Sequence, residues 1–134
     1  MLIRAATEAD LDALLSFEHI GREALARCAR DGFAYAVELD GKIVGVLRYS
    51  LFWQAIPFLD LIFLAREARG KGIGTGAMRF WEARMRECGY RDVMTSTQAD
   101  ETAWFFYEKL GYRRVGGFHP PGQEAEELIY SKRL

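Results

Sequence analysis

The stretch Arg66-Glu-Ala-Arg-Gly-Lys-Gly-Ile-Gly-Thr-Gly76 decides how the fold of this 134-residue sequence is interpreted. It follows an apolar run, Phe58 to Leu64, that is typical of a buried strand, and it opens a helical pattern that continues to about Cys88. Glycines let the backbone approach a ligand closely, and the first turn of a helix carries unpaired N–H groups and a partial positive charge. We therefore expect this turn to bind the diphosphate of a nucleotide-type cofactor.

Two better-known phosphate-binding motifs do not fit this stretch. A dinucleotide fingerprint places its first glycine directly after the strand and an acidic residue about twenty positions further on, whereas no suitable Asp or Glu follows near Val93. A Walker loop requires Gly-Lys-Ser/Thr, which Gly70-Lys71-Gly72 does not supply. An ATP-binding protein of a different fold stays an alternative, but the missing motif argues against it.

Two segments carry a resemblance to a known family. The pattern Arg69-x-x-Gly72-x-Gly74 resembles the acyl-CoA pyrophosphate loop of the GNAT family of N-acetyltransferases. Downstream, the run from Phe106 to Tyr112 (Phe-Tyr-Glu-Lys-Leu-Gly-Tyr) resembles the Tyr-Glu-Lys-x-Gly-Phe segment of the same family. The distance between the two segments also fits, and together they cover roughly residues 58–115.

The order of periodic segments predicts an α/β domain with a mixed sheet. Asp40-Gly41 lies between two strand-like runs and is a strong hairpin signal. The strand before the glycine turn and the strand from Val93 are joined by a helix, so they should run parallel. The expected strands are 2–4, 33–39, 42–53, 58–64, 93–98, 112–118 and 126–132, and the expected helices start near 7, 22, 72 and 102.

The resemblance implies more about the architecture than the periodicity does. It implies one N-acetyltransferase domain over residues 1–134, with a central sheet of about six to seven strands flanked by about four helices. Two splayed parallel strands would form the acyl-CoA cleft. The backbone of the strand that ends at Leu64 would contact the pantetheine arm. The predicted cofactor-binding residues are Ile62, Phe63, Leu64, Arg69, Gly70, Lys71, Gly72, Ile73, Gly74, Thr75 and Asp100.

Three of these residues carry open alternatives. Arg69 and Lys71 either contact the phosphates or are solvated surface cations. Many relatives carry an asparagine seven residues before the tyrosine, where this sequence has Asp100. An ionised aspartate accepts hydrogen bonds but cannot donate them, so the contact with the pantetheine arm is altered or passes to Gln98.

Tyr107 is the predicted general acid. A phenol is protonated at neutral pH and can donate its proton to a departing thiolate. Ala103, Phe106, Tyr107 and Leu110 also follow the spacing of an ordinary helical core face, which is the alternative interpretation. The match to the family segment favours the catalytic one.

Asp60 is the predicted general base. Its carboxylate interrupts the apolar run Ile56 to Leu64, and a buried charge is costly unless it has a partner or a role. It could deprotonate an amine directly or through water, or bind a cationic substrate. A structural ion pair is the alternative. Candidates for acceptor contacts are the segment His19–Arg22, the pair Phe52–Trp53, and His119.

Composition limits the remaining possibilities. The formal net charge of −1 gives no general affinity for nucleic acid. No apolar run is long enough to span a membrane, and the N-terminus lacks the apolar core of a signal peptide. Cys28 and Cys88 are isolated, so we expect two buried, reduced thiols in a cytoplasmic protein and no metal site.

The resemblance implies an enzyme that transfers an acetyl group from acetyl-CoA to a primary amine by direct attack in a ternary complex. The acceptor would be a small molecule or a peptide, with no nucleic acid, membrane or metal involved. The closing strands could pair across a homodimer. The alternative function is a non-catalytic acyl-CoA-binding or sensing module, which the replacement at Asp100 and the uncertain base favour.

Overall fold

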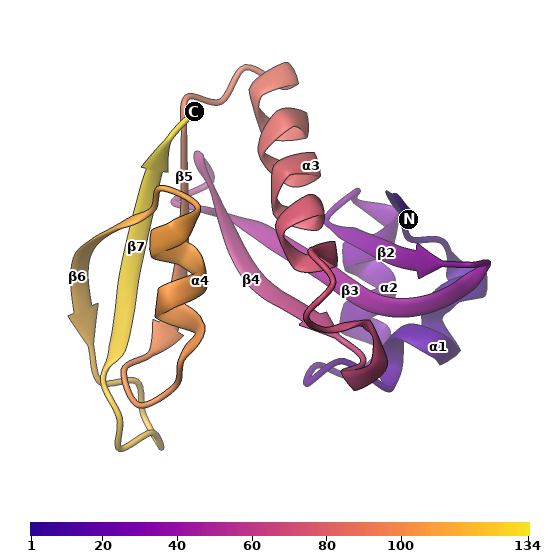
Figure 1. Cartoon of the computed structure of the whole chain (residues 1–134), viewed down its shortest axis with the longest axis horizontal. Coiled ribbons are helices and arrows are strands. Elements are labelled where there is room, and N and C mark those ends of the chain that lie inside the picture. Colours follow the sequence, from indigo (N-terminus) through magenta and orange to yellow (C-terminus); the bar gives the residue numbers. More distant parts are fainter. The chain divides into compact units, whose positions relative to one another are not determined.

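The computed structural model describes residues 1–134 and contains seven strands, four α-helices and two short 3₁₀ helices (Figure 1). The strands are β1 (Leu2–Ala5), β2 (Ala34–Leu39), β3 (Lys42–Phe52), β4 (Ile56–Leu64), β5 (Asp92–Gln98), β6 (Arg113–Phe118) and β7 (Glu127–Arg133). The helices are η1 (Glu8–Asp10), α1 (Leu11–Leu15), α2 (Arg22–Arg30), η2 (Arg66–Ala68), α3 (Ile73–Glu87) and α4 (Ala103–Lys109).

The seven strands follow the order β1-β2-β3-β4-β5-β7-β6 in one mixed sheet. The pairs β1–β2, β2–β3, β5–β7 and β6–β7 are antiparallel, whereas β4 and β5 are parallel. The parallel register joins Phe58 to Met94 and Leu59 to Thr95. These pairings confirm the predicted α/β class, the strand number and the parallel pair.

The chain forms two compact units. The first contains residues 1–50 and 60–83, and the second contains residues 51–59 and 84–134. Strand β4 and helix α3 each contribute residues to both units. The single domain over residues 1–134 therefore stays a prediction.

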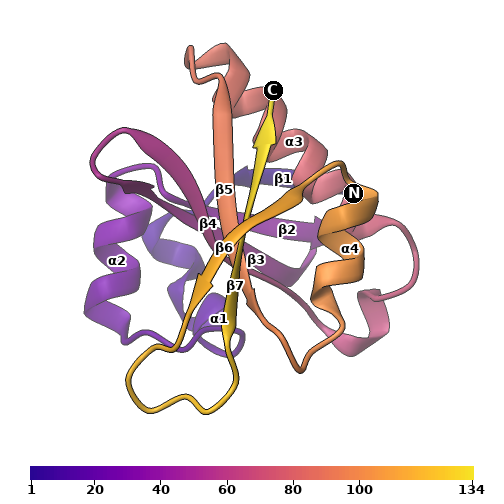
Figure 2. The same cartoon turned by 90° about the vertical axis from the view of Figure 1, so that its left-hand side faces the viewer.

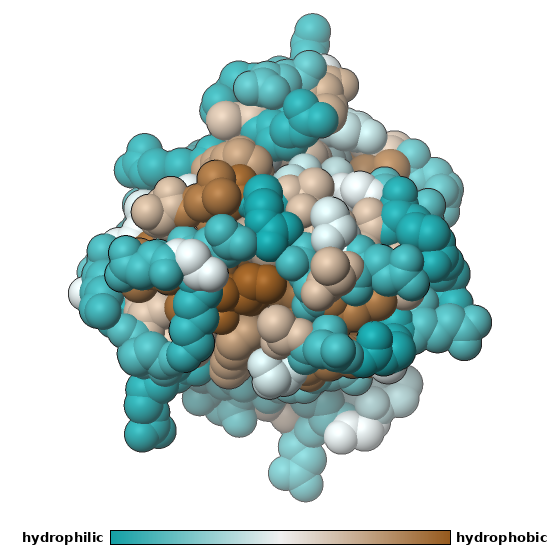
Figure 3. Space-filling view, turned by 90° about the vertical axis from the view of Figure 1, so that its right-hand side faces the viewer, coloured by the Kyte–Doolittle hydropathy of each residue, from teal (hydrophilic) through white to brown (hydrophobic).

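In the first unit, α1 and α2 cover one face of the sheet. Side chains alternate along a strand, so Ala34, Ala36 and Val46 share a face. They form a buried core with Leu14 and Leu25, which come from α1 and α2. The half-buried side chains Leu61 and Phe63 of β4 pack against the same core. The outer surface of this part of the molecule is mostly hydrophilic, with smaller hydrophobic areas between the polar side chains (Figure 3).

The opposite face of the same strands packs against the first part of α3. Tyr35 of β2 contacts the ring of Phe80 edge-on with a centroid distance of 5.4 Å, and Tyr49 of β3 contacts Trp81 at 5.7 Å. Aromatic rings bury large apolar areas, so these contacts fix the helix on the sheet. Trp81 of α3 is fully buried in this packing, and its neighbour Glu82 is buried as well.

In the second unit, α4 lies beside β5 and β7 (Figures 1 and 2). Thr95 and Thr97 of β5 are buried, as are their register partners Tyr130 and Leu128 of β7. All residues of β6 are exposed, and this strand forms the edge of the sheet.

One local prediction from the sequence is confirmed and another is wrong. The hairpin at Asp40-Gly41 is confirmed, because both residues have positive φ angles, 53° and 77°, and Leu39 pairs with Lys42. The prediction of two buried thiols is wrong, since Cys28 is half-buried and Cys88 is exposed at the end of α3, although both are free. No helix is long and apolar enough to cross a membrane.

Candidate functional site

The glycine turn connects the end of β4 to the start of α3, and both ends belong to the first unit. Gly70 and Gly72 have φ angles of +72° and +79°, which L side chains rarely adopt. A Cβ at either position would meet no atom within 4 Å, so the space beside the backbone is open. The glycines therefore provide both the turn conformation and an open approach to the main chain.

The N-terminus of α3 supplies hydrogen-bond donors at this turn. Its first backbone bond there runs from the Gly76 N–H to the Gly72 carbonyl at 3.0 Å. The N–H groups of Ile73, Gly74 and Thr75 precede it and have no acceptor within the helix. Together with the positive end of the helix dipole, they suit an anion. The segment 70–75 therefore fits the diphosphate of an acyl-CoA.

Arg69 is anchored, whereas Lys71 is a free surface cation. The Nε of Arg69 donates a hydrogen bond to the Leu64 carbonyl at 3.0 Å. Its guanidinium carbon lies 5.1 Å from the centroid of the Phe63 ring, which is a cation–π distance. Lys71 is exposed on the turn. Arg69 is therefore held at one side of the turn, and its remaining N–H groups are available to an anion.

The end of β4 is fixed against β3 by close backbone contact. The Ala65 N–H donates to the Val44 carbonyl at 2.7 Å. A Cβ at Gly45 would lie 2.5 Å from the Phe63 carbonyl oxygen, so only glycine fits at that position. Ile62, Phe63 and Leu64 are half-buried, and the Leu64 carbonyl is the acceptor for Arg69.

Asp60 also lies in the first unit, beside a buried ion pair. Arg48 of β3 donates from Nε to the Glu18 Oε2 at 2.8 Å and from Nη2 to the Oε1 at 3.2 Å. The Glu18 side chain is 0% exposed, and Arg48 Nη1 lies 3.6 Å from the Asp60 Oδ2. Burial raises the pKa of Asp60 and outweighs the opposing effects of Ser50 and Arg48. A raised pKa makes this carboxylate a stronger base.

Tyr107 is buried in the second unit and ends a chain of hydrogen bonds. The Thr95 hydroxyl donates its proton to the Leu59 carbonyl at 3.0 Å. Thr95 is also a side-chain hydrogen-bond partner of the Tyr107 phenol. Burial raises the pKa of Tyr107, Thr95 opposes the rise, and the negative charge of Glu127 adds to it. Tyr107 therefore stays protonated at neutral pH.

The other predicted residues are less constrained. Asp100 is exposed in the turn after β5. His19 and His119 are also exposed, and Arg22 forms an ion pair with Asp12. Trp53 is 80% exposed at a turn, where its φ of 56° and that of Gln54 at 60° form a tight hairpin without glycine.

The structure adds residues that the sequence analysis missed. Glu18 and Arg48 are far apart in sequence, and only the fold brings them to Asp60. Glu127 accepts hydrogen bonds from Ser96 and Gln123 in the second unit. Neither cluster has a local sequence signal. No group of three or more His, Cys, Asp or Glu side chains gathers where it could hold a metal ion.

The predicted site residues therefore divide between the two units. Asp60, the β4 residues Ile62–Leu64 and the turn from Arg69 to Thr75 belong to the first unit, whereas Asp100 and Tyr107 belong to the second.

Comparison with known proteins identifies relatives over most of the chain. The model of the acetyltransferase (GNAT) family matches residues 4–112. An uncharacterised N-acetyltransferase of Methanocaldococcus jannaschii is 28% identical over 98% of this chain and 92% of its own length. The blasticidin-S acetyltransferase of Streptomyces morookaense is 33% identical over 71% of each chain.

Several solved acetyltransferase structures share this fold, and two of them illustrate the similarity. The ribosomal-protein-alanine N-acetyltransferase of Brucella melitensis superposes with a TM-score of 0.84 and 26% identity, covering 100% of both chains. The PaiA N-acetyltransferase of Thermoplasma acidophilum, solved in complex with coenzyme A, superposes with a TM-score of 0.82 and 16% identity, covering 99% of this chain and 98% of its own.

Proposed function

This chain belongs to the acetyltransferase (GNAT) family, and from that premise we propose that it transfers an acetyl group from acetyl-CoA to a primary amine in a ternary complex. The observation that carries the choice of donor is the turn at residues 70–75. Its positive-φ glycines leave open space beside unpaired N–H groups at a helix N-terminus. The coenzyme A complex of the Thermoplasma acidophilum relative supports the same donor.

The main-chain amides of residues 70–75 bind the diphosphate, and Arg69 adds a fixed positive charge beside them. The half-buried backbone of Ile62, Phe63 and Leu64 binds the pantetheine arm. Asp100 contacts the arm as an acceptor only. Lys71 adds a mobile positive charge on the turn. When bound, acetyl-CoA supplies the thioester that the amine attacks.

Tyr107 donates the proton that the departing thiolate needs. Its raised pKa keeps the phenol protonated at neutral pH, so the proton is present when the thiolate leaves. Its hydrogen bond to Thr95 fixes the orientation of the phenol before the reaction.

Asp60 removes the proton from the attacking amine, directly or through a water molecule. The raised pKa of its carboxylate strengthens it as a base. The positive charge of Arg48, 3.6 Å away, opposes this rise in pKa. Its side chain is 28% exposed, so the carboxylate is accessible to an incoming molecule.

The names of the relatives suggest two acceptor classes. The Streptomyces morookaense relative acts on blasticidin S, which is a small molecule, and the Brucella melitensis protein acts on a ribosomal-protein alanine. We propose an acceptor of the small-molecule or peptide amine class. Homodimer formation and a cytoplasmic location stay predictions.

Release of free thiol from acetyl-CoA in the presence of amines tests this function. The panel should contain blasticidin S, spermidine, hexylamine and a peptide with an N-terminal alanine, with coenzyme A binding measured in parallel. Thiol release that depends on one of the amines is the expected result. Tight coenzyme A binding with no turnover on any amine would contradict the transferase function and favour the binding module.

A further inference from the structure

The carboxylate of Glu127 is held by two neutral side chains in the second unit. Its Oε2 accepts a hydrogen bond from the Ser96 Oγ at 2.6 Å. Its Oε1 accepts one from the Gln123 Nε2 at 3.0 Å, and the same amide donates to the Ala125 carbonyl at 2.9 Å. One donor comes from β5 and the other from the segment before β7, so both carboxylate oxygens have fixed positions.

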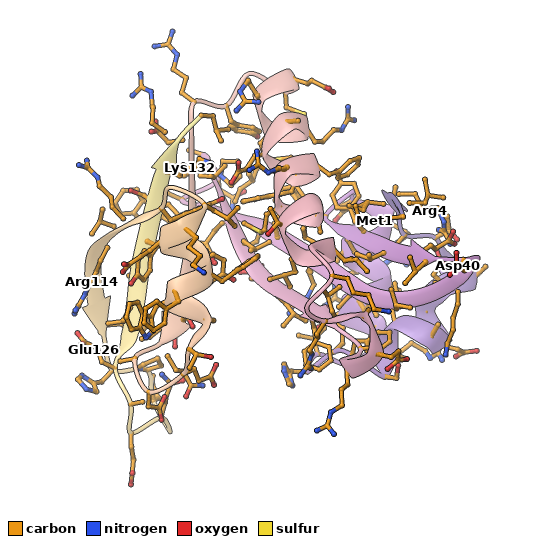
Figure 4. The ribbon with its side chains drawn as sticks, in the orientation of Figure 1. Met1, Arg4, Asp40, Arg114, Glu126 and Lys132 are labelled. Atoms are coloured by element: carbon orange, nitrogen blue, oxygen red, sulfur yellow. The ribbon has the colours of Figure 1, made fainter.

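The charge of Glu127 is not neutralised by any side chain. Its partners are a hydroxyl and an amide, and no Lys or Arg forms an ion pair with it. Its neighbour Glu126 differs, because its Oε1 lies 3.2 Å from Nη2 of Arg114, which belongs to β6 (both residues are labelled in Figure 4). Because both partners are neutral, the carboxylate keeps its full negative charge, and this charge would attract a cation.

Glu127 lies on the face of the sheet opposite α4. In the register of β5 and β7, Gln98 pairs with Glu127 and Thr97 pairs with Leu128, so Glu127 and Ser96 share one face. Tyr107 of α4 contacts the other face, where its ring lies 6.5 Å from that of Tyr130. The polar residues of the Glu127 face are half-buried rather than buried, so a ligand can reach the carboxylate.

We propose that Glu127, oriented by Ser96 and Gln123, binds an ammonium group of the amine acceptor. This inference rests on the proposed transferase function and specifies its substrate as a primary amine that carries a second, cationic amino group. The ammonium donates hydrogen bonds to the carboxylate and keeps its proton there. Proton removal from the attacking nitrogen stays with the base. Glu127 is thus a residue for acceptor specificity.

Calorimetric titration with spermidine, in the presence of saturating coenzyme A, tests the site without requiring turnover. Glu127→Gln removes the charge and keeps the size of the side chain, and we expect the Kd of spermidine to rise at least about tenfold. The matched control Glu126→Gln removes the same charge one residue away, and we expect less than about a twofold change. Ser96→Ala retains the carboxylate without one of its donors, so it should give an intermediate rise.

The outcomes separate this inference from the proposed function. Equal effects of Glu127→Gln and Glu126→Gln would overturn the site, and so would unaltered amine affinity in Glu127→Gln. Absence of amine binding to the wild type would overturn it too. The proposed transferase function fails on a different observation, namely the absence of thiol release. That result can occur even when amine binding is intact. The unfolding temperature of each variant is measured as well. A value close to that of the wild type shows that the variant is folded, and Ser96→Ala is the smallest of these changes.

Discussion

The Nε of Arg69 donates a hydrogen bond to the Leu64 carbonyl at 3.0 Å and so ties the glycine turn to the end of β4. The Phe63 ring lies under the same guanidinium group. Two residues of the strand thereby hold a cation that would otherwise move freely in solvent. The turn at residues 70–75, which we propose binds the diphosphate, consequently has one fixed positive charge beside it.

Replacing Arg69 by Gln should weaken coenzyme A binding about 3–10-fold, because one charge-assisted contact to a phosphate is lost. The unfolding temperature should hardly change, since Arg69 is exposed. Calorimetric titration with coenzyme A gives the affinity. Arg66→Gln, in the same exposed turn, is the control, and an equal loss in that variant would assign the effect to overall charge.

Replacing Tyr107 by Phe should lower kcat at least about tenfold, because the thiolate then lacks its proton donor. The Kd of coenzyme A should remain within about twofold of the wild-type value, because the phenol makes no ground-state contact in this account. Tyr90→Phe removes the hydroxyl of another tyrosine and should leave kcat unchanged. A Tyr107→Phe enzyme with full activity would remove this residue from the mechanism.

The pH dependence of kcat gives a second test of Tyr107. Burial raises the pKa of its phenol above the ordinary value of 10.0, so the acid form persists to that pH and beyond. A loss of kcat caused by this group should therefore appear only above about pH 10. A loss centred near neutral pH that disappears in Tyr107→Phe would show that the phenol has a lowered pKa instead.

Removing only one partner of the Arg48–Glu18 pair should lower the free energy of unfolding much more than removing both charges together. Arg48→Met leaves a charged side chain with 0% exposure unpaired at Glu18, and it should lower the free energy of unfolding by about 3–5 kcal/mol. The double variant Arg48→Met/Glu18→Gln removes both charges and should recover most of this loss. Chemical denaturation of the four proteins of the cycle measures the coupling. Additive losses would show that the pair is not a unit.

The ion pair of Arg4 with Asp10 should make stability depend on acid pH. Hydrogen bonds from Arg4 lower the pKa of Asp10 from 3.8 to about 2, against the opposing effect of burial. The lowered pKa stabilises the fold above about pH 4, and this contribution, about 2 kcal/mol, is lost as the pH falls through 2. The free energy of unfolding of Asp10→Asn should lack this part of the pH dependence. An identical acid dependence in both proteins would contradict the pair.

Much of the fold was predictable because local chemistry specified it. Asp40 and Gly41 can both adopt positive φ, so the hairpin between β2 and β3 followed from two residues. The turn at Trp53-Gln54 has the same conformation but neither glycine nor asparagine, so its position was set by the strands on either side. Strand bounds agree with the predicted ranges to within two residues, and the helices expected near 22, 72 and 102 begin within one residue of those positions. The helix expected near 7 begins instead as the short 3₁₀ helix η1 at Glu8, and α1 starts only at Leu11.

The site was predictable only where it is continuous in sequence. The turn at residues 70–75 carries its own signal, since glycine spacing and position before a helix act locally. The Arg48–Glu18 pair and the Ser96–Glu127 pair join residues 30 and 31 positions apart, and nothing local distinguishes these charges from surface ones. The burial of Glu82 in α3 has no local signal either, because it depends on the surrounding fold.

A crystal structure of this protein with bound coenzyme A tests the central claim most directly. We expect the diphosphate within hydrogen-bonding distance of the N–H groups of residues 70–75, with the Arg69 guanidinium beside it. A complex in which this segment contacts no phosphate, or in which coenzyme A occupies another surface, would contradict the account.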